Sequence, residues 1–143
     1  MALNQLSVFV DNAPGALSDI TSILAGAGVN LRALSIADTE RFGILRMIVS
    51  DNELAISVLK ARNYVVKETQ VVGVKIGDQP GKLSEALKVL ELAGINLEYL
   101  YAFCARTERH AYMVIRVADN GKAEDALTAA GFHLIEDTDI AKL

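Results

Sequence analysis

Apolar residues recur along this chain with two different periods. In residues 5–10 they alternate with their neighbours, which is typical of a strand that has one face on a core. After each Pro-Gly pair they follow helical spacing instead, at Leu17, Ile20, Ile23, Leu24 and Ala27, and again at Leu83, Ala86, Leu87, Leu90 and Ala93. Each of these two stretches predicts an amphipathic helix.

The patterns belong to an internal repeat that covers most of the chain. With a shift of 66 positions, Pro14-Gly15 meets Pro80-Gly81, and Asn30 meets Asn96. From Val49 onward the shift is 68, so the second copy has gained two residues around Arg106 to Arg109. We therefore expect one supersecondary unit to occur twice.

Each repeat predicts the element order βαββαβ. The predicted second strands cover 29–37 and 95–103, the third strands 43–49 and 111–117, and the second helices 52–62 and 120–130. Gly28 and Gly94 end the first helices, and Asn63 and Gly131 end the second, because all four suit positive φ. The order indicates an α+β fold of two ferredoxin-like units, each an antiparallel sheet with both helices on one face.

The two units are predicted to span residues 1–70 and 71–143, and no flexible linker separates them. Residues 65–76 pass from the last strand of one unit into the first strand of the next. Residues 43–49 are apolar at nearly every position, which predicts that the sheet face away from the helices is covered as well. We expect the units to lie side by side and the chain to form a homodimer.

Composition and net charge argue against some classes of binding partner. The 143 residues are 52% hydrophobic, and 14 basic against 18 acidic residues give a net charge of -4, which argues against a nucleic-acid partner. No signal-peptide or membrane-spanning pattern is found, so we expect no membrane partner and a cytoplasmic location. Cys104 is the only cysteine, which excludes an intramolecular disulfide, and we expect it to be buried or half-buried.

The Pro-Gly loops carry the functional prediction. Proline is tolerated in the first turn of a helix, and the N–H groups of Gly15, Ala16 and Leu17 would point out of the helix start toward a carboxylate. Gly81, Lys82 and Leu83 repeat this arrangement. Asn30 and Asn96 begin the second strands and could accept from an ammonium while donating to a carboxylate. Helix capping by Asn12 and Asp78, and turn formation by Asn30 and Asn96, are the alternatives.

Both copies of the loop and helix resemble the signature of ACT domains, which are regulatory modules that bind amino acids. The similar segments read NAPGALSDITSILAGAGVNLRALSI and DQPGKLSEALKVLELAGINLEYLYA. The resemblance implies a ligand between two units, held by Asn12, Ala13, Gly15, Ala16, Leu17 and Asn30 and by Asp78, Gln79, Gly81, Lys82, Leu83 and Asn96. Val10 and Ile76 stand where some members have a histidine, so the resemblance does not identify the ligand.

Catalytic and cofactor motifs are missing from the sequence. The glycines of GAGVN end a helix where a dinucleotide fingerprint would begin one, and no nucleophile elbow or phosphate loop occurs. His110, His133 and Cys104 lack metal-site spacing. We expect an amino-acid-sensing regulator with no enzymatic activity, cofactor or metal.

Two questions stay open at this level. The alternative function is a regulatory subunit that docks on a biosynthetic enzyme, as the small subunit of acetolactate synthase does, although that subunit does not repeat the Pro-Gly loop in its second half. Tyr99, Tyr101 and Phe103 alternate along one strand, so they could form an aromatic wall for a ligand or pack in a core.

Overall fold

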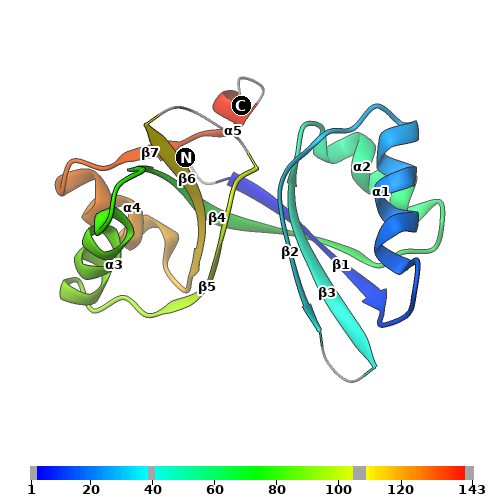
Figure 1. Cartoon of the computed structure of the whole chain (residues 1–143), viewed down its shortest axis with the longest axis horizontal. Coiled ribbons are helices and arrows are strands. Elements are labelled where there is room, and N and C mark those ends of the chain that lie inside the picture. Colours follow the sequence, from blue (N-terminus) through cyan, green and yellow to red (C-terminus); the bar gives the residue numbers. More distant parts are fainter. Residues whose placement is uncertain (1–2, 39–40, 105–108, 141–143) are drawn as a thin grey trace. The chain divides into compact units, whose positions relative to one another are not determined.

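The computed structural model describes residues 3–38, 41–104 and 109–140 (Figure 1). Its strands are β1 (Leu3–Asp11), β2 (Leu31–Asp38), β3 (Phe42–Val49), β4 (Val66–Gly77), β5 (Leu97–Ala102), β6 (His110–Val117) and β7 (His133–Ile135). Its helices are α1 (Ala16–Gly26), α2 (Asn52–Lys60), α3 (Lys82–Leu92), α4 (Asn120–Ala129) and the short α5 (Asp137–Ile140), which the sequence did not predict. The predicted α+β fold with βαββαβ order in each half is confirmed.

The chain forms two compact units, which we call the N-terminal unit and the C-terminal unit. The N-terminal unit runs from Asn4 to Thr69, and the C-terminal unit begins at Gln70 and also takes in Leu3. The division falls within β4, which gives its first residues to one unit and the rest to the other. The last strand of the first repeat and the first strand of the second are therefore one continuous strand.

In the N-terminal unit, β3 lies between β2 and β1, and β4 follows β1. Antiparallel pairing sets Val8 opposite Leu45 and Leu34 opposite Met47. Alternate residues of β1 and β3 therefore face α1 and α2, where they bury one core with the two helices. Its fully or nearly buried members are Leu6, Val8, Val10, Ile20, Leu24, Val29, Leu45, Met47, Val49, Ala55 and Leu59.

The C-terminal unit repeats this arrangement with the strand order β7-β4-β6-β5. Val74 lies opposite Met113 on β6 and opposite Leu134 on β7. The helices α3 and α4 pack against each other and close the core of this unit. Its buried members are Val72, Val74, Ile76, Ala86, Leu90, Met113, Ile115, Val117, Ala123 and Leu127.

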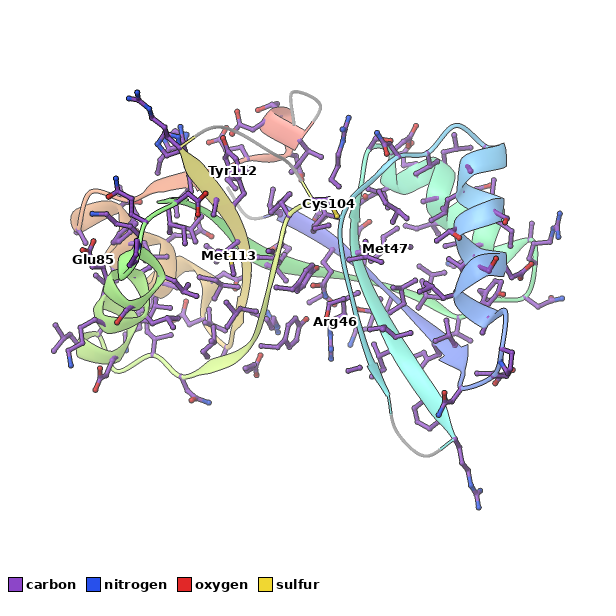
Figure 2. The ribbon with its side chains drawn as sticks, viewed as in Figure 1. Arg46, Met47, Glu85, Cys104, Tyr112 and Met113 are labelled. Carbon is purple, nitrogen blue, oxygen red and sulfur yellow. The ribbon has the colours of Figure 1, made fainter. Side chains whose placement is uncertain are left out.

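Strand residues alternate between the two faces of each sheet, as Figure 2 shows for Arg46 and Met47 on β3. Met47 belongs to the helix-facing core, whereas Arg46 leaves the strand on the other side. The face away from the helices also holds buried residues, since Ile48 is 2% exposed and Val114 is fully buried. Phe9 and Phe42 lie on the same face and are 45% and 44% exposed, so the prediction that this face is covered stays a prediction. Cys104 is exposed, so the prediction of its burial was wrong.

The predicted helix stops are present. Gly28 and Gly94 follow α1 and α3 with φ of 76° and 71°, and Asn63 and Gly131 follow α2 and α4 with φ of 67° and 90°. The predicted gain of two residues around Arg106 to Arg109 falls mostly at 106–108, outside the described part of the chain. Within the described ranges, no helix is both long and apolar enough to cross a membrane.

Candidate ligand-binding site

The helices α1 and α3 begin at glycines in a left-handed conformation. Gly15 has φ 84° and Gly81 has φ 90°, and neither helix start receives a side-chain cap. The other two long helices are capped, because the carboxylates of Asp51 and Asp119 accept from backbone N–H groups three residues on, at 3.1 Å in each case. Capping by Asn12 and Asp78 is therefore excluded: each lies three residues before the cap position.

Some backbone N–H groups at the uncapped starts of α1 and α3 already have hydrogen-bond acceptors. The N–H of Ala16 donates to the carbonyl of Ala13 at 3.3 Å, so this predicted donor already has a partner. The N–H of Lys82 donates in the same way to Gln79 at 3.2 Å. Within the described chain, the N–H groups of Gly15 and Leu17 meet no acceptor. Unpaired N–H groups at a helix start carry partial positive charge and attract anions.

Space beside the two glycines is open. A Cβ built on Gly15 or Gly81 would meet no heavy atom within 4 Å beyond its chain neighbours. The preceding loop residues of both copies, among them Asn12 and Asp78, are exposed. The loops are therefore accessible to a ligand, but a single loop does not enclose one.

The asparagines lie at the other end of the same helices. Asn30 follows α1, whose 11 residues span about 16 Å, so it is remote from the loop at residues 12–17. Its backbone exchanges two hydrogen bonds with Ser50, each of 2.9 Å, which leaves the exposed side-chain amide for other contacts. One unit thus does not bring its own loop and asparagine together.

Two hollows in the C-terminal unit show the same separation. Asn96 lines a hollow of about 490 Å³ together with Glu91 and Gly94, where α3 ends. Lys82 lines another, of about 450 Å³, where α3 begins. The two predicted residues therefore belong to different surfaces.

The hollow at Lys82 also contains residues that sequence patterns did not connect. His110 and His133 both line it, with Lys75. The spacing of the two histidines argued against a shared site because they lie in different elements, yet the strand order puts β4 between β6 and β7. The predicted ferredoxin-like order contains this signal, since strands three and four of such a unit flank strand one. Among the described residues, no cluster of three His, Cys, Asp or Glu could hold a metal ion.

Two of the three alternating aromatic residues at 99–103 are almost fully buried. Tyr101 and Phe103 are each 8% exposed, which favours packing over a ligand wall for these two residues.

In the N-terminal unit, the hydroxyl of Tyr64 donates to the carboxylate of Asp19 on α1. This hydrogen bond, with burial and the negative charge of Asp19 adding to it, raises the pKa of Tyr64 above its ordinary value. The contact ties the residue after the α2 turn to the first turn of α1.

The fold is a repeat of two units, each with a Pro-Gly turn before its first helix. A family model for the ACT domain pair matches residues 1–143. The chain therefore belongs to the ACT-domain family, whose members are regulatory domains that bind small ligands.

Solved structures agree with this assignment. Protein BT0572 from Bacteroides thetaiotaomicron superposes with a TM-score of 0.92 at 37% identity, over 100% of this chain and 98% of that one. The regulatory subunit of aspartate kinase from Thermus flavus shares the fold, with a TM-score of 0.62 and 16% identity over 91% of this chain and 93% of that one. Aspartate kinase from Synechocystis gives 0.60 and 21% identity over 90% of this chain and 25% of that one. No curated protein matches the chain.

Proposed function

We propose that this protein is a non-catalytic regulator that binds a free amino acid, with the ligand carboxylate at the start of α1 or α3. The observation that carries the proposal is the contrast between the helix starts. Asp51 and Asp119 cap α2 and α4, whereas α1 and α3 begin at open glycines. Unpaired N–H groups at Gly15 and Leu17 suit a carboxylate, and membership of a ligand-binding family supports the same use.

We further propose that residues 1–70 and 71–143 are separate ACT domains and that each site combines two of them. The loop of one domain would hold the carboxylate, and an asparagine of another, Asn30 or Asn96, would hold the ammonium. This requirement follows from the length of α1 and α3, each of 11 residues. A homodimer supplies such pairs of domains. Asp78 repels a carboxylate where Asn12 does not, so the two kinds of site differ in affinity.

A ligand held between domains can act as a signal. It binds better in one relative arrangement of the domains and shifts the protein toward that arrangement. Couplings of this kind are worth about 1–3 kcal/mol, which changes the affinity for a regulated enzyme by roughly 5- to 150-fold. The ligand therefore needs no chemical conversion to exert its effect.

The test is a thermal unfolding panel of the purified protein with each of the twenty amino acids. A ligand at 100 times its Kd adds about 2.7 kcal/mol, and one or a few amino acids should raise the Tm by several degrees. A panel without any responder would contradict the proposal that a free amino acid is bound.

Two variants then locate the site. Ala16→Asp and Lys82→Asp each place a carboxylate at the first residue of a helix, where it favours the helix dipole but repels a ligand carboxylate. Together they should abolish the response while the protein stays folded. Lys122→Asp is the matched control, because it puts the same charge in the first turn of α4, which Asp119 already caps. An unchanged response in the double variant would place the ligand elsewhere.

The second candidate function is docking on a biosynthetic enzyme. Phe9 and Phe42 of the N-terminal unit are 45% and 44% exposed, and their rings meet edge to face at 6.0 Å. Val65 is 62% exposed, and its carbonyl accepts from the N–H of Phe9. An exposed apolar cluster of this kind favours a protein partner. Phe9→Ser with Phe42→Ser should then prevent co-purification of the enzyme, and retention of the enzyme would exclude this surface.

A further inference from the structure

We propose that the C-terminal unit binds a compact anion, a phosphate or carboxylate group, in the hollow lined by Lys75, Lys82, His110 and His133. This hollow, which we call the basic hollow, is open to solvent and has a volume of about 450 Å³. The inference goes beyond the proposed amino-acid site. Of the six residues assigned to the second site, only Lys82 lines the basic hollow.

Strand register gathers the side chains. Lys75 and Gly77 are two residues apart on β4 and so share a face. His133 on β7 lies opposite Lys75, and His110 on β6 lies opposite Gly77. Residues directly opposite in an antiparallel pair point to the same side of the sheet. Lys75 and both imidazoles are therefore directed to one side of the end of β4.

Lys82 reaches this place from α3 because Gly77 has no side chain. A Cβ on Gly77 would lie 3.1 Å from Cγ of Lys82 and 3.4 Å from its Cδ. The stem of Lys82 thus packs over the glycine, at the strand position beside His110. The sheet and the helix together supply two ammonium groups and two imidazoles to a single hollow.

The described residues that line the basic hollow include more basic than acidic side chains. Among the described lining residues Glu85 is the acidic one, and its Oε2 lies 3.6 Å from Nζ of Lys82. Figure 2 labels Glu85 on α3, where its side chain is 60% exposed. An exposed ion pair of this kind contributes little, so an incoming anion can replace the carboxylate. A phosphate or carboxylate group accepts several charge-assisted hydrogen bonds from such donors.

The fold itself does not require basic residues at this corner. In the N-terminal unit the repeat places Phe9, Phe42 and Val65 where the C-terminal unit has Lys75, His110 and His133. The backbone pairing is equivalent, because Phe42 lies opposite Asp11 as His110 lies opposite Gly77. The same corner is thus built with apolar side chains in one unit and with basic ones in the other. Stability of the fold does not account for the basic set.

The test is a two-dimensional NMR titration of the full chain with inorganic phosphate, at constant pH and with chloride keeping the ionic strength constant. We expect saturable shifts at residues 75–77, at His110 and at residues 131–133. Lys75→Gln combined with His133→Gln should weaken phosphate binding about tenfold. Lys88→Gln is the matched control, since Lys88 is an exposed lysine of α3 that pairs with Glu91 and does not line the hollow. Glu85→Gln should tighten binding.

Malonate provides the second arm. Saturation by phosphate alone assigns the hollow to phosphate groups, and saturation by both anions assigns it to either group. Shifts that stay linear with both anions would overturn the proposal, as would equal affinity in the Lys75→Gln/His133→Gln variant and the Lys88→Gln control. The amino-acid proposal is tested separately, because Ala16→Asp should leave phosphate binding intact and Lys75→Gln/His133→Gln should leave an amino-acid response intact.

Discussion

Replacement of Gly73 by alanine should destabilise the C-terminal unit. Gly73 lies within β4, opposite Ile135 on β7 and Val114 on β6. A Cβ at this position would stand 2.6 Å from Cδ1 of Leu3 and 3.0 Å from Cβ of Ile135. Leu3 is fully buried and Ile135 is 2% exposed, so neither side chain can turn into solvent to relieve the overlap.

The size of the effect follows from two opposing contributions. Forcing one extra methyl into a packed core costs about 1–3 kcal/mol. Alanine also restricts the unfolded chain, which returns about 0.4–1 kcal/mol. The net loss should be about 1–2 kcal/mol, which corresponds to a fall in Tm of about 3–7 °C in a chain of this length.

Urea unfolding followed by circular dichroism measures this loss. Gly121→Ala is the matched control, because Gly121 lies in α4 and its added Cβ would meet only Oδ1 of Asp119, at 3.6 Å. That variant should be as stable as the parent or more stable. Leu3→Ala removes the clashing atom, so Gly73→Ala should cost less in its presence than alone. A Gly73→Ala variant that unfolds at or above the urea midpoint of the parent would refute the reasoning.

Three further predictions concern the helix starts and one tyrosine. Gly15→Ala should lower the free energy of unfolding by about 1 kcal/mol, because Gly15 has a φ of 84°. Gly26→Ala, within the same helix α1, should not lower it. Equal urea midpoints for the two variants would contradict the left-handed conformation at the helix start. Asp119→Ala should cost about 1 kcal/mol through the lost cap of α4, while Lys122→Ala keeps the capped N–H and should change the midpoint little. The pKa of Tyr64 should lie above its ordinary value in an ultraviolet titration and fall in Asp19→Asn. Because the folded state favours the neutral phenol, the hydrogen bond of Tyr64 contributes its full stability below the unfolded pKa, and this contribution is lost as pH rises through the folded pKa. A Tyr64 titration curve that is identical in Asp19→Asn would contradict this contact.

Local patterns predicted most of the fold because its elements are short and strongly periodic. Alternation in residues 5–10 and helical spacing from Leu17 to Ala27 are set by which side chains face the core, and the repeat shows each pattern twice. Leu3 could not be assigned in this way. Sequence position gives it to the first unit, but its side chain packs beside Gly73 and Ile135 in the C-terminal unit. Only the tertiary fold decides such a contact.

The site was predicted less completely, and the reason is geometric. The Pro-Gly pattern correctly located the starts of α1 and α3, but Asn12 and Asp78 were one turn too early to cap them. The loop at residues 12–17 and Asn30 both match the family pattern, but the 11 residues of α1 separate them within one unit. The basic hollow depends on strand order, which links His110 to His133 across residues that no local window spans.

The comparison of the two repeats separates what the backbone does from what the side chains do. Both units begin their first helix at an open left-handed glycine, and both cap the second with an aspartate, so these features follow from the repeated fold. At the end of the first strand, by contrast, the aromatic pair Phe9 and Phe42 corresponds to Lys75 and His110. A duplicated backbone site with different flanking side chains should accept the same carboxylate-bearing class of ligand in both units. Besides Asp78 in place of Asn12, the corner beside each helix start also distinguishes the two units, because it is apolar in the N-terminal unit and forms the basic hollow in the C-terminal unit.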